Sequence, residues 1–269
     1  MFRKRKLIMK IIKIFSVMCF MSYTQAFAAN SAPCETNESN CWQCGDNCVA
    51  RLDSEGKMTV SGSGEMWNYN SIKDENEVWR STAPWAYESI QSIEIGEGIT
   101  QVGAYDFYMK HDVSNIILPE SLKIIGSGAF LASNGPSEIN LPDSLTRIGY
   151  GTFANNRNLT TIEIPDSVQY IDISVFHNDE NLTAVYFGEN SQLKEIGDKA
   201  FKNTPNLNSL ILPVSVSKIA ESAFIDSGIT ALYCTKAQID NAICDAEHLG
   251  LSEDKIVHYE QKINAPYIK

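Results

Sequence analysis

The sequence predicts a repeat solenoid, a rod in which successive turns of the chain contribute short parallel strands. The first observation is that phenylalanines recur in register through the middle of the chain, with spacings of 23, 23, 23, 25 and 23 residues. A fixed period between about 20 and 50 residues indicates a solenoid or an array of repeats. The phenylalanines are Phe107, Phe130, Phe153, Phe176, Phe201 and Phe224.

A second set of residues keeps the same period. Each of them closes a short apolar run, and their spacings are 23, 23, 23, 23 and 25 residues. The set is Gly96, Pro119, Pro142, Pro165, Gly188 and Pro213. Because both sets share one interval, the two extra residues of the longer repeat lie between Gly188 and Phe201.

The pattern inside one repeat predicts its structure. In the repeat that ends at Phe176, Ile162 and Ile164 alternate with polar residues, which is typical of a strand with one buried face. Pro165 has no N–H to donate and ends that strand. Ile171 then points inward again. One coil cannot bury its own apolar face, but its neighbours cover that face when the coils stack.

The repeat unit L-x-x-I-x-L-P-x-S-L-x-x-I-G-x-x-A-F resembles the BspA-type leucine-rich repeat, and the resemblance runs from Ile90 to about Cys234. It implies a right-handed coil with a parallel β-sheet, short helical or turn segments and a cap at each end. Pro136 replaces the usual leading Leu, and Gly96 and Gly188 stand where Pro is usual. The Asn ladder of the better-known leucine-rich repeat is absent, so we expect the Pro-acid-Ser segment to take its turn role.

The resemblance extends to the chain before the repeats. Residues 44–70, with Pro84 and Trp85, are similar to the N-terminal module that often precedes these repeats in bacterial surface proteins. What this implies is surface attachment, meaning binding to another cell, to a host matrix protein or to an envelope partner.

The first 28 residues have the pattern of a signal peptide. They carry six basic residues and no acid, followed by a short apolar run and the small-residue site Ala26-Phe27-Ala28. The apolar run is shorter than the roughly 20 residues that a membrane-spanning helix needs. We therefore expect cleavage after Ala28 and an extracellular, cell-surface or periplasmic product, with an N-terminal membrane anchor as the alternative.

Four segments are expected along the chain. They are the signal peptide (1–28), a Cys/Trp-rich N-terminal β-hairpin module and cap (29–89), the repeats (90–234) and a C-terminal helix-strand cap (235–269). After cleavage the chain retains 16 Lys and Arg against 33 Asp and Glu, a net charge of −17. Such an acidic surface argues against binding to nucleic acid or to anionic lipid by charge.

The two ends need caps, because terminal coils would otherwise expose their apolar cross-section. At the start, residues 49–62 predict a β-hairpin. We expect most of the tryptophans to plug the first coil, with a sugar-stacking platform as the alternative. The tryptophans are Trp42, Trp67, Trp79 and Trp85.

At the other end, the spacing of Thr235 and Gln238 predicts a capping box that opens a helix. Apolar residues from Ile239 to Ala246 recur on one helical face, and Gly250 is expected to end the helix. Residues 254–260 then predict a last strand.

Six cysteines follow the leader, and an even number in an exported chain predicts disulfides. The expected disulfide cysteines are Cys34, Cys41, Cys44, Cys48, Cys234 and Cys244. A bond between Cys234 and Cys244 would tie the last repeat strand to the cap helix, while the N-terminal four allow three pairings. Alternatives for the N-terminal four are a redox motif at Cys41-Trp-Gln-Cys44 and a zinc site.

The sequence indicates no catalytic residue, metal site or cofactor. Its four histidines lie in four separate segments and give no Ser-His-Asp order. A column of carboxylates follows the strands, but one side chain per turn falls short of the six or more oxygens that Ca²⁺ prefers. The column is Glu97, Glu120, Asp143, Asp166 and Glu189.

The outward strand positions are the candidate binding surface, since apolar groups on a preformed sheet suit an interface. The candidates are Glu94, Ile117, Asn140, Glu163, Tyr186, Ile211 and Tyr233. The expected function is an exported adhesion module that binds a protein or glycan partner, without an enzymatic step. The alternatives are a redox or metal-binding protein that uses the N-terminal cysteines, and a purely structural envelope component.

Overall fold

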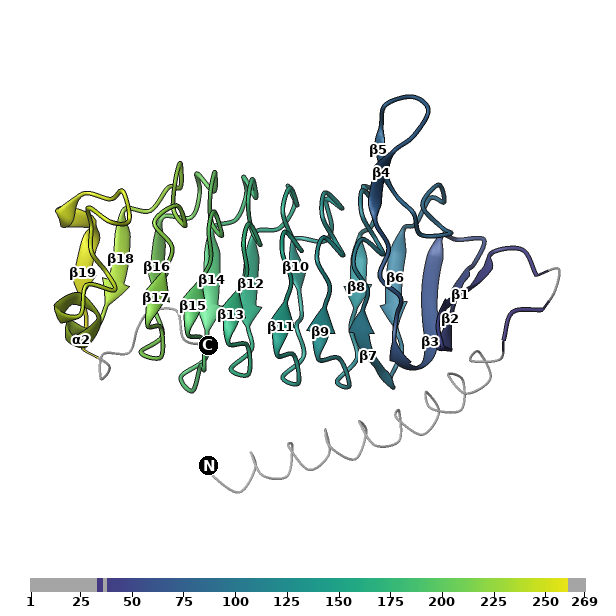
Figure 1. Cartoon of the computed structure of the whole chain (residues 1–269), viewed down its shortest axis with the longest axis horizontal. Helices are drawn as coiled ribbons and strands as arrows, with labels where there is room; N and C mark the ends of the chain where they lie inside the picture. The colour runs from purple at the N-terminus through teal and green to yellow at the C-terminus, as the bar shows by residue number, and fades with distance from the viewer. Residues whose placement is uncertain (1–32, 36–37, 261–269) are drawn as a thin grey trace, which may run out of the picture.

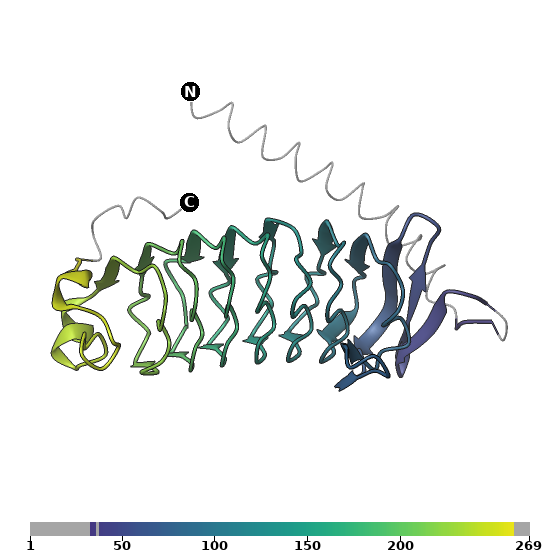
Figure 2. The ribbon, with the colours of Figure 1, turned by 90° about the horizontal axis from the view of Figure 1, so that it is seen from above.

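The chain coils into a β-solenoid of about seven turns with almost no helix, and its coils follow one another along the rod in chain order (Figures 1 and 2). The computed structural model describes residues 33–35 and 38–260. The expected signal peptide lies outside them. The predicted solenoid of parallel strands is confirmed.

Each coil contributes two strands, and the first series contains the strands that alternation predicted. These strands carry the alternating isoleucines and leucines, whose inward side chains are buried. The first series is β6 (Ser92–Ile95), β8 (Asn115–Ile117), β10 (Glu138–Ile139), β12 (Thr161–Ile164), β14 (Ala184–Phe187), β16 (Ser209–Ile211) and β18 (Ala231–Cys234).

The second series forms a separate parallel ladder. The sequence predicted that Ile171 and its equivalents point inward, but not that these positions form strands. Most of its strands are two residues long, so no alternation marks them, but their inward isoleucines pair in register from coil to coil. The series is β7 (Ile99–Val102), β9 (Ile124–Ile125), β11 (Arg147–Ile148), β13 (Tyr170–Ile171), β15 (Glu195–Ile196) and β17 (Lys218–Ile219).

The second ladder is continuous, whereas the first is interrupted. The first series separates into β6–β8, β10–β12–β14 and β16–β18 with the terminal strand β19 (Ile256–His258). The first gap lies between β8 and β10. The second gap follows β14, where the chain carries its two extra residues.

A column of rings runs through the core. Neighbouring phenylalanines from Phe107 to Phe224 stack with centroids 5.4 to 6.0 Å apart and ring planes within 11° of parallel. All six rings are buried. Trp85 begins the column, stacked on Phe107 at 6.1 Å, and its Nε1–H donates to the Asp106 carbonyl. The rings therefore form one continuous stack that Trp85 closes at its N-terminal end.

A buried polar column accompanies the rings. The third residue after each phenylalanine is polar, and at four of the six positions its side chain donates to backbone carbonyls that would otherwise be buried without a partner. Ser133 Oγ donates to Phe107 O, and Asn156 Nδ2 donates to Phe130 O and Phe153 O. The buried members are Lys110, Ser133, Asn156, Asp179 and Thr204.

The second residue after each phenylalanine turns the chain through the left-handed region. Three of these residues are asparagines with φ near 60°, which tolerate this conformation better than most residues. Asn178 Nδ2 donates to Asn155 Oδ1, and Asn203 Nδ2 donates to Asn178 Oδ1. An amide ladder is thus present, although at a different position from the Asn ladder that the repeat unit lacks.

The N-terminal cap continues the solenoid with antiparallel strands β1 (Cys41–Gly45), β2 (Asn47–Leu52) and β3 (Lys57–Glu65). The β2–β3 hairpin is the predicted one, and β3 pairs in parallel with both β6 and β7. Only half of the tryptophans fit the expected plug. Trp85 is buried and Trp42 packs against the core, whereas Trp67 and Trp79 are exposed.

A second hairpin, β4 (Ser71–Lys73) and β5 (Trp79–Ser81), leaves the rod and projects away from the coils (Figure 1). It pairs only with itself. The sequence analysis did not predict it, because the segment carries no repeat and its two strands are three residues each.

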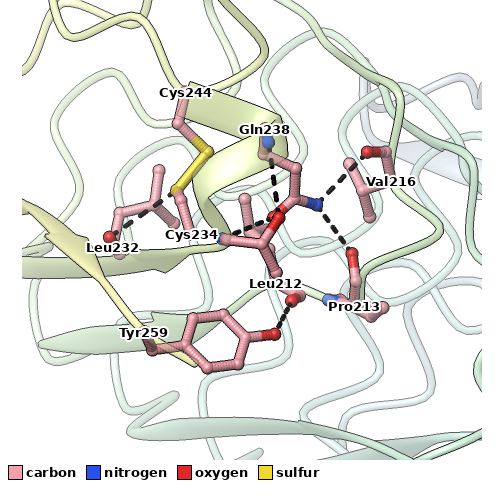
Figure 3. Close-up of a disulfide and its surroundings, with 9 residues drawn as sticks. Leu212, Pro213, Val216, Leu232, Cys234, Gln238, Cys244 and Tyr259 are labelled. Atoms are coloured by element: carbon pink, nitrogen blue, oxygen red, sulfur yellow. Dashed lines mark hydrogen bonds between the residues drawn. A yellow bond between two sulfur atoms is a disulfide. The ribbon is translucent and has the colours of Figure 1, made fainter. Parts of the chain in front are cut away.

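The C-terminal cap starts with helix α2 (Lys236–Asp240) and ends with β19, which extends the last sheet as predicted. The Thr235–Gln238 capping box is confirmed. Gln238 also donates to the carbonyls of Pro213 and Val216 in the preceding coil, which docks the helix (Figure 3). Within the described residues, no helix is both long enough and apolar enough to cross a membrane.

The predicted longer cap helix is wrong. The helix ends at Asp240, because Ala242 adopts a positive φ of 55° that breaks the helical path. Ala246 is still buried, but from a turn, and Ile239 is exposed. The expected bond between Cys234 and Cys244 is present and joins β18 to the segment after the helix (Figure 3).

Replacing Phe153 by Ala should lower the free energy of unfolding by about 3–5 kcal/mol, because it opens a cavity within the ring column. Urea denaturation followed by circular dichroism measures the loss. Tyr150→Ala, in the same coil but 46% exposed, is the matched control and should change stability by less than about 0.5 kcal/mol. Equal losses for the two variants would contradict the ring column.

Replacing both Cys234 and Cys244 by Ala should cost about 3 kcal/mol, because the bond closes a loop between residues separated by 10 positions. The same urea experiment under non-reducing conditions measures this. Adding reductant should bring the parent protein towards the variant, and a reductant effect that persists in the variant would assign the loss to another bond.

Candidate functional site

The outward strand column is where the sequence placed the candidate interface. Ile117 is 48% exposed, and Asn140 and Glu163 are also exposed. Parallel register sets Glu163 beside Tyr186 and Ile211 beside Tyr233. The last three members of the column, Tyr186, Ile211 and Tyr233, are half-buried. The column thus exists as a face, but it presents less apolar surface than its sequence suggested.

The prediction that Glu94 belongs to the binding surface is wrong, because its side chain is buried and not available to a partner. Only 7% of the residue is exposed, and its carboxylate forms an ion pair with Lys57. Strand β3 pairs with β6 and places Thr59 opposite Glu94, so that the cap covers this position. A sequence argument limited to the repeats could not see that strand.

The largest concentration of exposed apolar side chains lies instead between residues 67 and 87. Tyr87 is 72% exposed, Trp79 is 49% exposed and Trp67 is 44% exposed. We define the hairpin surface by its exposed members. These are Trp67, Ile72, Val78, Trp79 and Tyr87.

The hairpin surface is held by ion and ring contacts. The Arg80 guanidinium lies 4.9 Å from the Tyr87 ring centroid, and Lys73 Nζ lies 5.9 Å from that of Trp79. Arg80 Nε donates to Asp74 Oδ2 at 2.7 Å, which lowers the pKa of that carboxyl. Asp74 Oδ1 accepts from two backbone N–H groups of the turn. The Trp79 ring is therefore presented on an ordered hairpin, and the Tyr87 ring lies against Arg80 of that hairpin. The signal that could have identified it was the density of aromatic residues outside the repeat.

The N-terminal cysteines form one bond and one thiol pair. Cys34 is bonded to Cys41. The sequence left the pairing of the four N-terminal cysteines open. The Sγ atoms of Cys44 and Cys48 lie 3.2 Å apart as buried thiols, so a disulfide at these two residues stays a prediction. The Cys41-Trp-Gln-Cys44 motif does not act as one dithiol, because Cys41 is bonded outside it. The side chains of Cys34, Glu38 and Cys41 are spaced closely enough to bind a metal ion, but both sulfurs of this cluster form the Cys34–Cys41 disulfide.

The carboxylate column takes part in turns. Glu97 Oε1 accepts from the backbone N–H of Glu120 one coil further on. The serines after the acids reach the neighbouring coil as well, as in Ser121 Oγ donating to Ile99 O and Ser167 Oγ donating to Asp143 O. These contacts fit the turn role expected for the Pro-acid-Ser segment.

Two carboxyl groups are fully buried. Desolvation raises the pKa of Asp106 and of Asp179 well above the ordinary value. One oxygen of each accepts a backbone hydrogen bond, from Gly103 N–H and Asn156 N–H respectively, and the other has no partner among the described atoms. Neither lies at an opening, and each stands beside the ring column. Their position favours a structural role.

Comparison with known proteins shows the family of the repeats. Residues 100–230 match six copies of the family described as BspA type leucine rich repeat region. No curated protein is significantly similar in sequence.

A solved structure shares the fold. A leucine rich cell surface protein from Faecalibacterium prausnitzii A2-165 is 18% identical, with a TM-score of 0.51 over 74% of this chain and 55% of its own. A leucine-rich repeat protein from Eubacterium ventriosum is 17% identical, with a TM-score of 0.47 over 71% of each chain. This chain thus spans little more than half the length of the first protein.

Replacing Asp179 by Asn should stabilise the protein increasingly as pH rises. The folded-state pKa of Asp179 is raised, so the stability from its bound proton is full below the ordinary carboxyl pKa and is lost as pH rises towards the folded value. The asparagine does not titrate. Urea denaturation of both proteins between about pH 4 and pH 8 measures the difference in unfolding free energy. Glu180→Gln, the exposed neighbour, is the control, and a pH-independent difference for Asp179→Asn would refute the assignment.

Proposed function

Since this chain is a BspA-type leucine-rich repeat protein, we propose that it is an exported module that binds a protein partner through the hairpin surface. The outward strand column extends the contact along the rod. In this proposal residues 1–28 direct export, and residues 29–89 form the cap module that carries the binding arm. The repeats of 90–234 and the closing segment 235–269 provide a rigid support.

The observation that carries the proposal is the exposure of Trp79 on the β4–β5 hairpin, which pairs with no other described strand, and of Tyr87 in the turn that follows it. Aromatic side chains dominate the binding energy of many interfaces, and they bring large area at small cost in side-chain entropy. Burial of exposed apolar groups of this kind stabilises a complex by about 25 cal/mol for each Å² removed from water. The ion pair of Arg80 with Asp74 holds the arm before binding.

The acidic balance of the chain indicates the character of the partner. A net charge of −17 after leader cleavage repels other acidic surfaces and speeds encounter with basic ones. The proposed partner is therefore a protein with a basic patch that also offers an apolar pocket. We place that partner on another cell, in host matrix or on the envelope. In support, the Faecalibacterium relative is named a cell surface protein.

Trp79→Ala and Tyr87→Ala should each weaken partner binding by about 2 kcal/mol or more, roughly 30-fold in Kd, because they remove interface anchors. The partner is first captured by cross-linking the purified protein to intact-cell and matrix extracts, and its affinity is then measured by surface plasmon resonance. Both substitutions are on exposed side chains and should leave the urea transition unchanged.

Val214→Ala is the matched control, because its side chain is 48% exposed at the far end of the rod, and it should bind normally. Tyr186→Ala and Ile211→Ala test the strand column. If these two weaken binding while Trp79→Ala and Tyr87→Ala do not, the partner uses the strand face and the hairpin proposal fails.

A further inference from the structure

The N-terminal cap holds a pair of thiols that are packed in the hydrophobic core and whose chemistry the proposed binding does not use. Cys44 lies in β1 and Cys48 in β2, on either side of the turn that joins these strands. Gly45 and Cys48 are register partners. The two Sγ atoms are 3.2 Å apart, and both residues are buried. A small approach of the two sulfurs is all that bond formation needs.

Every other cysteine among the described residues is already bonded, in the pairs Cys34–Cys41 and Cys234–Cys244. Cys44 and Cys48 are therefore left with each other. We propose that these two residues are a dithiol that closes to a third disulfide by exchange with a disulfide oxidant, such as oxidised glutathione. This inference is independent of the proposed partner binding.

The Cys44–Cys48 bond forms in two thiol–disulfide exchange steps. The Cys48 thiolate attacks one sulfur of the oxidant, whose S–S bond breaks and releases the first thiol. Cys44 then loses its proton and attacks Cys48 Sγ in the mixed disulfide, which releases the second thiol. The cysteine pair gives up two protons and two electrons, and the oxidant takes them up.

One contact favours Cys48 as the first nucleophile. The Cys44 S–H donates to Cys48 Sγ, and this hydrogen bond lowers the pKa of the Cys48 thiol although burial opposes it. The same contact, with burial, raises the pKa of Cys44. Because the thiolate is the attacking species, the order Cys48 before Cys44 follows.

The turn around the pair is built close to the sulfur. A Cβ on Gly45 would lie 2.6 Å from Cys48 Sγ and would collide with the Glu65 carbonyl, so only glycine allows this approach. Asp46 and Asn47 at the tip of the turn are exposed. Opening of this short turn admits the oxidant without disturbing the coils.

Closing the Cys44–Cys48 bond would fix one end of the edge strand β1. β1 is the terminal strand of its sheet, so its outer edge has no neighbour among the described strands, and edge strands readily separate or pair with foreign chains. The Cys34–Cys41 bond already holds the start of β1. A Cys44–Cys48 bond would hold its other end to β2.

Disulfide mapping of the purified full chain tests the proposal. The protein is equilibrated with reduced and oxidised glutathione, quenched with acid, alkylated in denaturant and digested with a protease that cleaves before Asp. Cleavage before Asp46 and Asp53 separates Cys48 from Cys44. The fragment that carries Cys48 should stay joined to the fragment that ends at Gly45 until reductant is added.

Two variants test the pairing. The link should persist in the Cys34→Ser/Cys41→Ser double variant and disappear in Cys44→Ser. Oxidation should also raise the urea midpoint of the parent protein but not of Cys44→Ser. Release of an alkylated Cys48 fragment from the parent protein, under conditions that keep Cys234 and Cys244 bonded, would overturn the proposal. So would a link that is lost only when Cys34 and Cys41 are replaced.

Discussion

The structure depends on one constraint, which is that no coil can bury its own core. Each phenylalanine of the column is covered by the ring before it and the ring after it, at centroid distances of 5.4 to 6.0 Å. Burial therefore has to be completed at both ends by chain that is not part of the repeat. Trp85 and β3 do this at one end, and Gln238 with the Cys234–Cys244 bond anchors the closing segment at the other.

Much of this could be predicted from the sequence, because a large ring in a constant register leaves a periodic signal. The polar column was missed for the opposite reason. Its members range from Lys110 through Ser133 and Asn156 to Asp179, so that only the position is shared and the residue type is not. The inward positions of the second ladder were predicted, but its strands were not, because a two-residue strand has no alternation to detect. The cap helix was overestimated because apolar spacing says nothing about the positive φ of Ala242.

The candidate site was less predictable than the fold, since exposure depends on which elements meet. Glu94 occupies an outward strand position, yet the cap strand β3 lies against it and pairs it with Lys57. Trp67 and Trp79 are of a type usually buried, and neither periodicity nor spacing distinguishes them from Trp85. Only the three-dimensional placement shows that Trp85 closes the ring stack while Trp79 stands on an arm outside the coils.

The longer repeat shows how the rod accommodates a change in length. The two extra residues between Gly188 and Phe201 fall in the corner between β14 and β15, where the first ladder is interrupted. Across the same coil, Tyr170 still pairs with Glu195, and Phe176 still stacks on Phe201 at 5.4 Å. The corner thus absorbs the extra length at its exposed residues Glu189 and Asn190, while Leu193 of the same corner stays buried in the core. A short foreign loop or epitope spliced there would be displayed on the flank of the rod without disturbing its pitch.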